Sequence, residues 1–167
     1  AFARAMPPDA EYWIVGDGPE FGRLHGMIRS RKLSGKVKLW GRLPRKNALA
    51  KLAQCHVLLH PSLHDSGGWV CAEAMAASRP VICCNLGGPA TVVSDETGVR
   101  VEARDPVTAV SRLALAMSAL ASDHSKVQRM GRAASERVKH SMTWEHKIRA
   151  IVDCYEKVQA PNPQAAA

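Results

Sequence analysis

The amino-acid sequence predicts an α/β fold, in which helices flank a parallel β-sheet on both faces. Two observations support this prediction. Short apolar runs alternate with helix-compatible segments along the first two thirds of the chain, and this alternation is typical of βα units, which build parallel sheets. The runs are apolar at consecutive positions, as expected for strands that helices cover on both faces. Loops rich in Gly, Pro and Asn follow the runs, so we expect ligand-binding loops at the carboxyl edge of the sheet.

The expected elements follow from these runs and from helical spacing of apolar residues. The strands are expected at 12–15, 37–40, 57–60, 80–84 and 98–102. Proline opens several of the helices, as it often does at first helical positions. The helices are expected at 20–31, from Pro44 onward, and at 69–78, 106–120 and 125–140, with a last one after Thr143.

The two ends of the chain differ from its middle. Residues 1–6 are typical of the end of a helix, and the chain does not begin with Met, so we expect it to be part of a longer protein. Thr143 is expected to cap the last helix. An apolar stripe on this helix predicts a buried face formed by Ile148, Ile151, Val152 and Tyr155. We therefore expect one domain over residues 1–158 and a disordered tail over 159–167.

Composition limits the classes of partner and compartment. The chain has 167 residues, enough for one well-packed domain, and a formal net charge of +8. A basic balance favours nucleotides, nucleic acid or an anionic membrane surface, although solvated basic helix faces explain it equally. Basic and aromatic residues do not interleave as in single-strand binders, so no nucleic-acid partner is predicted. The five cysteines form no regular spacing, which indicates buried thiols in a reducing, cytoplasmic compartment, with peripheral membrane contact as one option.

The stretch 64–76 combines two carboxylates with a glycine pair. Asp65 and Glu73 are eight positions apart, and Gly67-Gly68 lies between them. A helix that begins near Gly68 leaves its first amides without intrahelical partners, and such amides bind anions. Because helical side chains lean toward the N-terminus, the Glu73 carboxylate can reach the same place and accept two vicinal ribose hydroxyls. The stretch therefore predicts a site for a ligand with phosphate and hydroxyl groups, such as a nucleotide sugar.

A purely structural interpretation of the same residues stays open. Asp65 and Ser66 can serve as helix caps, and Glu73 can be a solvated helix residue, since carboxylates are common near helix starts. His60 and His64 could be considered as metal ligands together with Asp65. A strand end and a loop offer no fixed ligand face, so no metal site is predicted. The four tryptophans are expected to serve mainly in packing: Trp13, Trp40, Trp69 and Trp144.

Several motifs of the chain resemble those of family 4 retaining glycosyltransferases, which are GT-B enzymes with two Rossmann-like domains that face a cleft. The likeness covers residues 1–158 and implies that the chain is a partial nucleotide-sugar-binding domain from the C-terminal half of such an enzyme. The motifs occur in the family's order. The matching segments are 15–19, 40–44, 60–76, 79–82, 87–88 and 143–145.

The resemblance implies a role for each matched site residue. Glu73 would hold the ribose hydroxyls of the donor, and Asp65, at the catalytic acid position, would contact the transferred sugar and orient its anomeric carbon. The donor sugar and distal phosphate would meet Asp65, Ser66, Gly67, Gly68 and Trp69. The base would meet a loop formed by Gly41, Arg42 and Leu43. The transferred sugar would keep its anomeric configuration, and no metal or other cofactor would be required.

The chain also departs from the family pattern. Asp65 replaces the usual Glu, Gly67 replaces a common Phe, and Thr91 stands where the Gly-Gly loop usually has Glu. The family's first βα unit, with its middle strand and its diphosphate-clamping basic residues, has no counterpart here, and neither does the N-terminal acceptor domain. We therefore expect weak donor binding and no turnover by this chain alone. A domain-swapped or otherwise paired homodimer is one hypothesis for covering the two free strand edges.

The sequence thus predicts a donor-binding domain that acts in retaining sugar transfer to an acceptor held by an N-terminal domain of the same protein. The alternative is a non-catalytic nucleotide or sugar-nucleotide binding module, in which the change at Asp65 marks lost catalysis.

Overall fold

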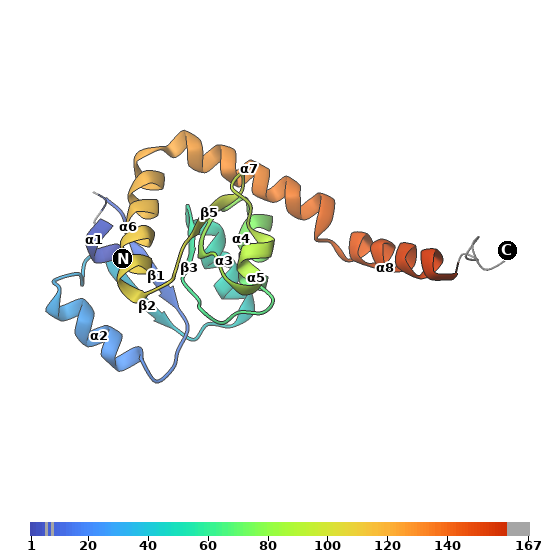
Figure 1. Ribbon diagram of the computed structural model, residues 1–167. Helices are drawn as coiled ribbons and strands as arrows, with labels where there is room; N and C mark the ends of the chain where they lie inside the picture. The colour runs from blue at the N-terminus through green and yellow to red at the C-terminus, as the bar shows by residue number, and fades with distance from the viewer. Residues whose placement is uncertain (6, 8, 160–167) are drawn as a thin grey trace.

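The computed structural model describes residues 1–5, 7 and 9–159, which form five strands and eight helices (Figure 1). The strands are β1 (Tyr12–Val15), β2 (Val37–Gly41), β3 (Leu58–His60), β4 (Val81–Cys84) and β5 (Gly98–Val101). The first helices are α1 (Phe2–Ala5), α2 (Phe21–Ser30), α3 (Arg45–Gln54), α4 (Trp69–Ala76) and α5 (Gly87–Val92). The last three are α6 (Pro106–Ser122), α7 (His124–Ser141) and α8 (Trp144–Gln159).

The strands form two parallel sheets, so the predicted fold class is confirmed. One sheet has the order β1-β2 and the other the order β3-β4-β5. Among the described residues β1 pairs only with β2, and β3 only with β4, which leaves each with one unpaired edge. This separation is what an absent middle strand predicts. The homodimer hypothesis for the free edges stays a prediction.

Helices cover both faces of the larger sheet because β4 is apolar at every position. Ile82 and Cys84 pack with Leu113 and Leu120 of α6 on one face. On the opposite face, Val81 and Cys83 pack with Cys71, Ala74 and Met75 of α4, while α7 contributes to both clusters through Val127, Met130 and Ala134. The two neighbouring cysteines thus point to opposite faces, as the strand period requires. Cys71, Cys83 and Cys84 are buried free thiols, which confirms that prediction.

The smaller sheet has its own cluster. Phe2 of α1, Leu33 and Val37 are buried together and pack against Tyr12 and other partly buried residues. On the other side of this sheet, the rings of Trp13 and Trp40 meet edge to face with centroids 5.7 Å apart. These two tryptophans therefore pack as expected. Trp69 and Trp144 do not, because they are 70% and 73% exposed.

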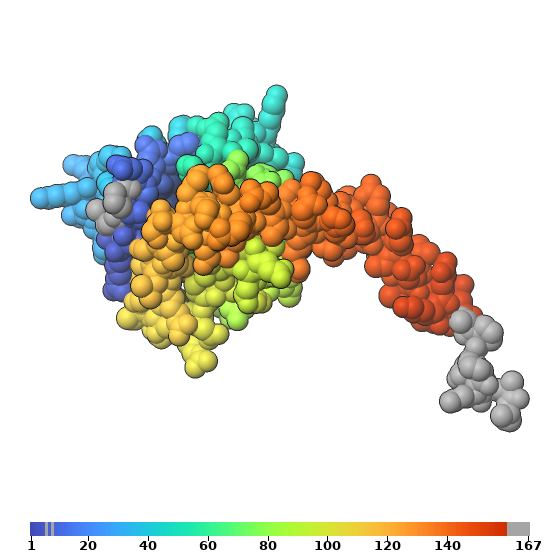
Figure 2. Space-filling model, turned by 90° about the horizontal axis from the view of Figure 1, so that it is seen from above, coloured from blue at the N-terminus to red at the C-terminus, as the bar shows by residue number. Residues whose placement is uncertain are grey.

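The prediction for the last helix was right about its start and wrong about its buried face. The Thr143 hydroxyl accepts a hydrogen bond from the His146 amide, as an N-cap does. The stripe expected to be buried is exposed at all four positions, Ile148, Ile151, Val152 and Tyr155. Figure 2 shows why: α8 projects away from the body of the described residues.

Two further boundaries differ from expectation. No helix was expected between the strands at 80–84 and 98–102, but α5 lies there and begins at Gly87. The tail was expected from residue 159, but α8 includes Gln159, and 160–167 lie outside the described residues. Among the described helices, none has the length and apolar character needed to cross a membrane.

Candidate functional site

The sequence-predicted site residues gather at the carboxyl edges of the two sheets. The loop 61–68 leaves β3, residues 85–86 leave β4, and the loop 42–44 leaves β2. Because all strand pairs are parallel, these connections leave from the same side of their sheets. The predicted base loop, glycine turn and Gly-Gly segment therefore stand at the edges where ligands bind in open α/β sheets.

Asp65 organises the turn before α4. One oxygen, Oδ1, accepts hydrogen bonds from the amides of Gly67 and Gly68 at 3.0 and 2.8 Å. The other oxygen, Oδ2, lies 2.9 Å from Nε2 of His60 at the end of β3. Hydrogen bonds from the Gly68 and Gly67 amides, together with His60, hold the pKa of Asp65 below its ordinary value. The carboxylate is therefore ionised at neutral pH and fixes the turn.

The start of α4 differs from one sequence expectation. Gly68 is the N-cap residue, in a left-handed conformation with φ of 62°, and no side chain caps the helix. The expectation that Ser66 caps it is therefore wrong, because the turn is held by Asp65 one residue earlier. The amides of Trp69 and Val70 form no hydrogen bond within the described part of the chain. They provide the donor groups that an anion can use at this helix end.

The two glycine pairs of the site pack against each other. A Cβ atom on Gly88 would lie 2.6 Å from both the carbonyl carbon of Gly67 and the carbonyl oxygen of Ser66. The Gly88 amide donates a 2.8 Å hydrogen bond to the Asp65 carbonyl oxygen. A Cβ on Gly87 would lie 2.5 Å from the same oxygen. The glycines thus permit backbone contact between the turn and α5, a reason for glycine that the sequence did not reveal.

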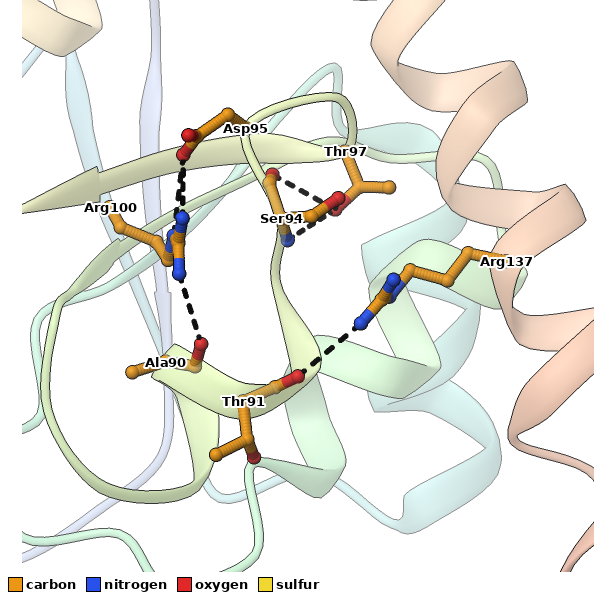
Figure 3. Close-up of polar contacts among 7 residues, drawn as sticks. All are labelled: Ala90, Thr91, Ser94, Asp95, Thr97, Arg100 and Arg137. Atoms are coloured by element: carbon orange, nitrogen blue, oxygen red, sulfur yellow. Dashed lines mark hydrogen bonds and ion pairs between the residues drawn. The ribbon is translucent and has the colours of Figure 1, made fainter.

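Two arginines donate hydrogen bonds to backbone carbonyl oxygens of α5 (Figure 3). Arg137 of α7 donates to the carbonyl oxygens of Val92 and Thr91 at 3.1 and 3.4 Å. Arg100 of β5 donates to the Ala90 carbonyl at 3.4 Å and forms an ion pair with Asp95 at 2.9 Å. Because these contacts hold the end of α5, they also hold its Gly87-Gly88 start against the site.

Glu73 lies one turn inside α4, as predicted, and forms an ion pair. Its Oε1 atom is 2.6 Å from a guanidinium nitrogen of Arg45, the first residue of α3. The Glu73 side chain is 32% exposed and that of Arg45 is 77% exposed. The partner of Glu73 is therefore a long, solvent-exposed side chain. A ligand can take its place on the Glu73 carboxylate without disturbing the core. Sequence reasoning missed Arg45, since 28 residues separate it from Glu73.

The predicted base loop borders a cavity. A hollow of about 430 Å³ is lined by Arg42, Leu43, Pro44 and Arg45. Gly41 has a φ of 62°, and its carbonyl oxygen accepts a 2.8 Å hydrogen bond from the Gly16 amide. The volume falls in the range of small-ligand pockets, roughly 300–1,000 Å³. Arg45 lines this cavity and also contacts Glu73, so its side chain links the cavity to α4.

The family comparison decides the identity of the domain. The model of "Glycosyl transferases group 1" matches residues 1–137. The chain belongs to the group 1 glycosyl transferases. Its structural neighbours are GT-B glycosyltransferases, which confirms the resemblance carried by the sequence motifs.

Curated relatives and solved structures agree with this membership. The glycosyl transferase chain is 29% identical over 153 residues to glycogen synthase of Mycobacterium tuberculosis, covering 91% of this chain and 36% of the relative. It is 32% identical to alpha-maltose-1-phosphate synthase of Mycolicibacterium smegmatis, covering 96% of this chain and 44% of the relative. It therefore spans less than half of the length of either relative.

Two solved structures share the fold. Sucrose-phosphate synthase from Thermosynechococcus elongatus matches with a TM-score of 0.75 and 26% identity, covering 95% of this chain and 41% of the neighbour. Anabaena Alr3699/HepE, solved in complex with UDP, matches with a TM-score of 0.69 and 25% identity, covering 82% of this chain and 38% of the neighbour.

Two further groups of candidate residues in this glycosyl transferase domain make contacts within the described part of the chain. Arg137 and Lys139, part of a basic cluster on α7, bind backbone carbonyls and Glu136 respectively. His60 pairs with Asp65, and the described residues hold no group of three His, Cys, Asp or Glu side chains placed to bind a metal ion. Contact with an anionic membrane surface stays a prediction.

Proposed function

We propose that this domain binds the nucleotide-diphosphate sugar donor of a retaining glycosyltransferase. The observation that carries the proposal is the Arg45–Glu73 ion pair, because it joins the cavity at 42–45 to the open amides at the start of α4. Neighbours such as Alr3699/HepE, whose structure contains UDP, support this class of ligand.

The base and ribose would occupy the cavity side of the site. The base would lie against Gly41, Arg42 and Leu43, which line or border the cavity. The ribose hydroxyls would take the place of Arg45 on the Glu73 carboxylate, which can accept two hydrogen bonds side by side. Arg45 is then released beside the diphosphate, where its guanidinium can bind phosphate oxygens.

The diphosphate and sugar would lie at the start of α4. The amides of Trp69 and Val70, together with the helix dipole, favour a phosphate oxygen there. The transferred sugar would meet Ser66, the turn at Gly67-Gly68 and the exposed indole of Trp69. The Asp65 carboxylate, which also holds the turn, would orient the anomeric carbon of this sugar.

The acceptor would be held by an N-terminal domain of the full-length protein, and sugar would be transferred with retention and without a metal. This chain alone would bind donor and not turn over. The chain spans less than half of the relatives' length, which leaves room for an acceptor domain outside it.

The test is nucleotide binding by Glu73→Gln and a matched control. Isothermal titration with UDP, GDP and ADP is expected to show binding of at least one nucleotide to the unmodified chain. Glu73→Gln should weaken it by about tenfold or more, because hydrogen bonds to a charged group contribute roughly 1.5–3 kcal/mol. Glu136→Gln changes an acid on α7 outside the site and should leave affinity unchanged. Absence of binding at millimolar nucleotide, or equal affinity in Glu73→Gln, refutes the proposal.

A second candidate is a non-catalytic sugar-nucleotide binding module. The observation in its favour is that both oxygens of Asp65 are already engaged, by two amides and by His60. The two functions differ in the full-length protein. A binding module transfers no sugar from any donor that it binds, whereas an enzyme does. If transfer is measured, its loss in an Asp65→Asn variant that folds and binds donor makes Asp65 catalytic, and unchanged turnover assigns Asp65 to the turn alone.

A further inference from the structure

A second cavity lies at the opposite edge of the larger sheet. His56 precedes β3, and Ser78 and Arg79 precede β4, so all three stand at the amino ends of parallel strands. The first turns of α7 close the cavity from the other side with His124 and Arg132. Its volume is about 410 Å³. It is therefore separate from the donor site, which lies at the carboxyl edge.

The cavity is basic, and no carboxylate lines it. Its charged and titratable lining consists of Arg79, Arg132, His56 and His124, with Gln128 and Ser78 as neutral polar groups. Asp123, the N-cap residue of α7, uses Oδ1 to accept from the Lys126 amide and the Ser125 hydroxyl. Like charges held together without a counter-ion oppose folding, so an anion bound here would relieve a repulsion present in the free protein.

Arg79 gives an independent indication of a missing partner. One guanidinium nitrogen donates a 2.9 Å hydrogen bond to the Ala53 carbonyl oxygen. Its Nε atom is buried and, in the part of the chain that the structure describes, is the one buried side-chain polar atom without a hydrogen-bond partner. A buried donor without an acceptor is costly, and native proteins rarely leave one.

The geometry of the cavity is fixed by close packing. Gly131 of α7 lies so near the turn before β4 that a Cβ atom there would be 2.3 Å from the Ser78 carbonyl oxygen. The imidazole rings of His56 and His124 meet edge to face at 6.1 Å, and Gln128 lies 3.1 Å from Nε2 of His124. The packing of α7 on the turn at Ser78 thus places Arg132 beside Arg79, and the exposed side chains of His56, His124 and Arg132 are open to a ligand from solvent.

We propose that this cavity, lined by His56, Arg79, His124 and Arg132, binds a phosphate group. Two guanidinium groups supply the forked donors that phosphate oxygens prefer. The phosphate can come from free inorganic phosphate or from a small phosphate monoester, and the volume accommodates the monoester. A ligand at this edge would contact α7 and the turns before β3 and β4, so its binding stabilises the elements that carry the donor site at their other end.

The experiment is an amide-resolved NMR titration of the 167-residue chain with inorganic phosphate and, separately, with glycerol 3-phosphate. Sodium chloride at matched ionic strength is the reference. Saturable shifts are expected at residues 56, 78–79 and 124–132, with a rise in melting temperature that depends on ligand concentration. Comparison of the two ligands distinguishes a site for free phosphate from one for a monoester.

Arg132→Gln is the decisive variant, because Arg132 lines the cavity with an exposed side chain, so its replacement leaves the core packing unchanged. It should weaken binding by about tenfold or more, as the loss of a charge-assisted hydrogen bond implies. Arg129→Gln, on the same helix but outside the lining, should bind as the unmodified chain does. No saturable response to either phosphate, shifts confined to 67–70, or equal weakening in Arg129→Gln overturns the proposal. His124→Ala gives an independent second variant.

Discussion

Replacing Gly88 by alanine tests whether the site is built on contact between two backbones. The added Cβ would lie 2.6 Å from the carbonyl carbon of Gly67, so the turn and α5 must separate by about 0.8 Å to reach ordinary contact distance. Overpacking of this kind costs about 1–3 kcal/mol. The shift also stretches the 2.8 Å hydrogen bond from the Gly88 amide to Asp65, which contributes about 0.5–1.5 kcal/mol.

The free energy of unfolding of Gly88→Ala should therefore fall by about 1.5–4.5 kcal/mol. Urea unfolding followed by circular dichroism measures it. In a thermal melt the same loss lowers the midpoint by about 3–18 °C. Gly26→Ala is the matched control, because no atom lies within 4 Å of a Cβ there and the residue is in the middle of α2. It should stabilise the chain by about 0.5–1 kcal/mol. A Gly88→Ala variant within about 0.5 kcal/mol of the unmodified chain would refute the packing argument.

Three further predictions concern pH, thiols and α8. Asp65 has a pKa in the folded chain below its ordinary value of 3.8, so its stabilising contribution is present above that pH and is lost as the pH falls through the folded pKa. The free energy of unfolding should therefore fall more steeply below about pH 4 in the unmodified chain than in Asp65→Asn. Parallel curves for the two proteins would contradict this. Burial raises the pKa of the Cys71 thiol to about 12 and that of Cys83 to about 11, so iodoacetamide at pH 8 should label exposed Cys154 and leave these two unmodified until urea is added, as peptide mass spectrometry can show. Ile151→Ala should change the free energy of unfolding by less than about 0.5 kcal/mol, because the side chain is 55% exposed; a loss of 2 kcal/mol or more would place this stripe in a buried interface.

The elements of the sheet could be predicted because their signals are local. Val81 to Cys84 is apolar at each position, and a strand with no polar face must be covered on both sides. The same reasoning failed for α8, since its apolar stripe at Ile148 and Ile151 has the same helical period as a buried stripe. Periodicity shows that a face is apolar and does not show what lies against it.

The positions of the two candidate carboxylates could be predicted from the sequence, whereas the contacts around them could not. The spacing of Asp65 and Glu73 placed both carboxylates at the start of a helix, and the structure agrees. The partner of Glu73 is Arg45, from an earlier helix, and the glycine turn packs on Gly88 from a later one. Such contacts depend on how distant segments meet, and no local pattern in a single sequence reports them.

These contacts determine which substitutions can test the function without also changing the structure of the site. Asp65 and Gly88 hold the turn itself, so a variant at either position changes the fold of the site together with any ligand contact. Glu73 and Arg45 differ, because they form a pair between a half-buried and an exposed side chain, and breaking such a pair costs at most about 1 kcal/mol of stability. A loss of nucleotide affinity in Glu73→Gln at nearly unchanged stability can therefore be assigned to the ligand, whereas the same loss in Asp65→Asn needs a folding measurement beside it.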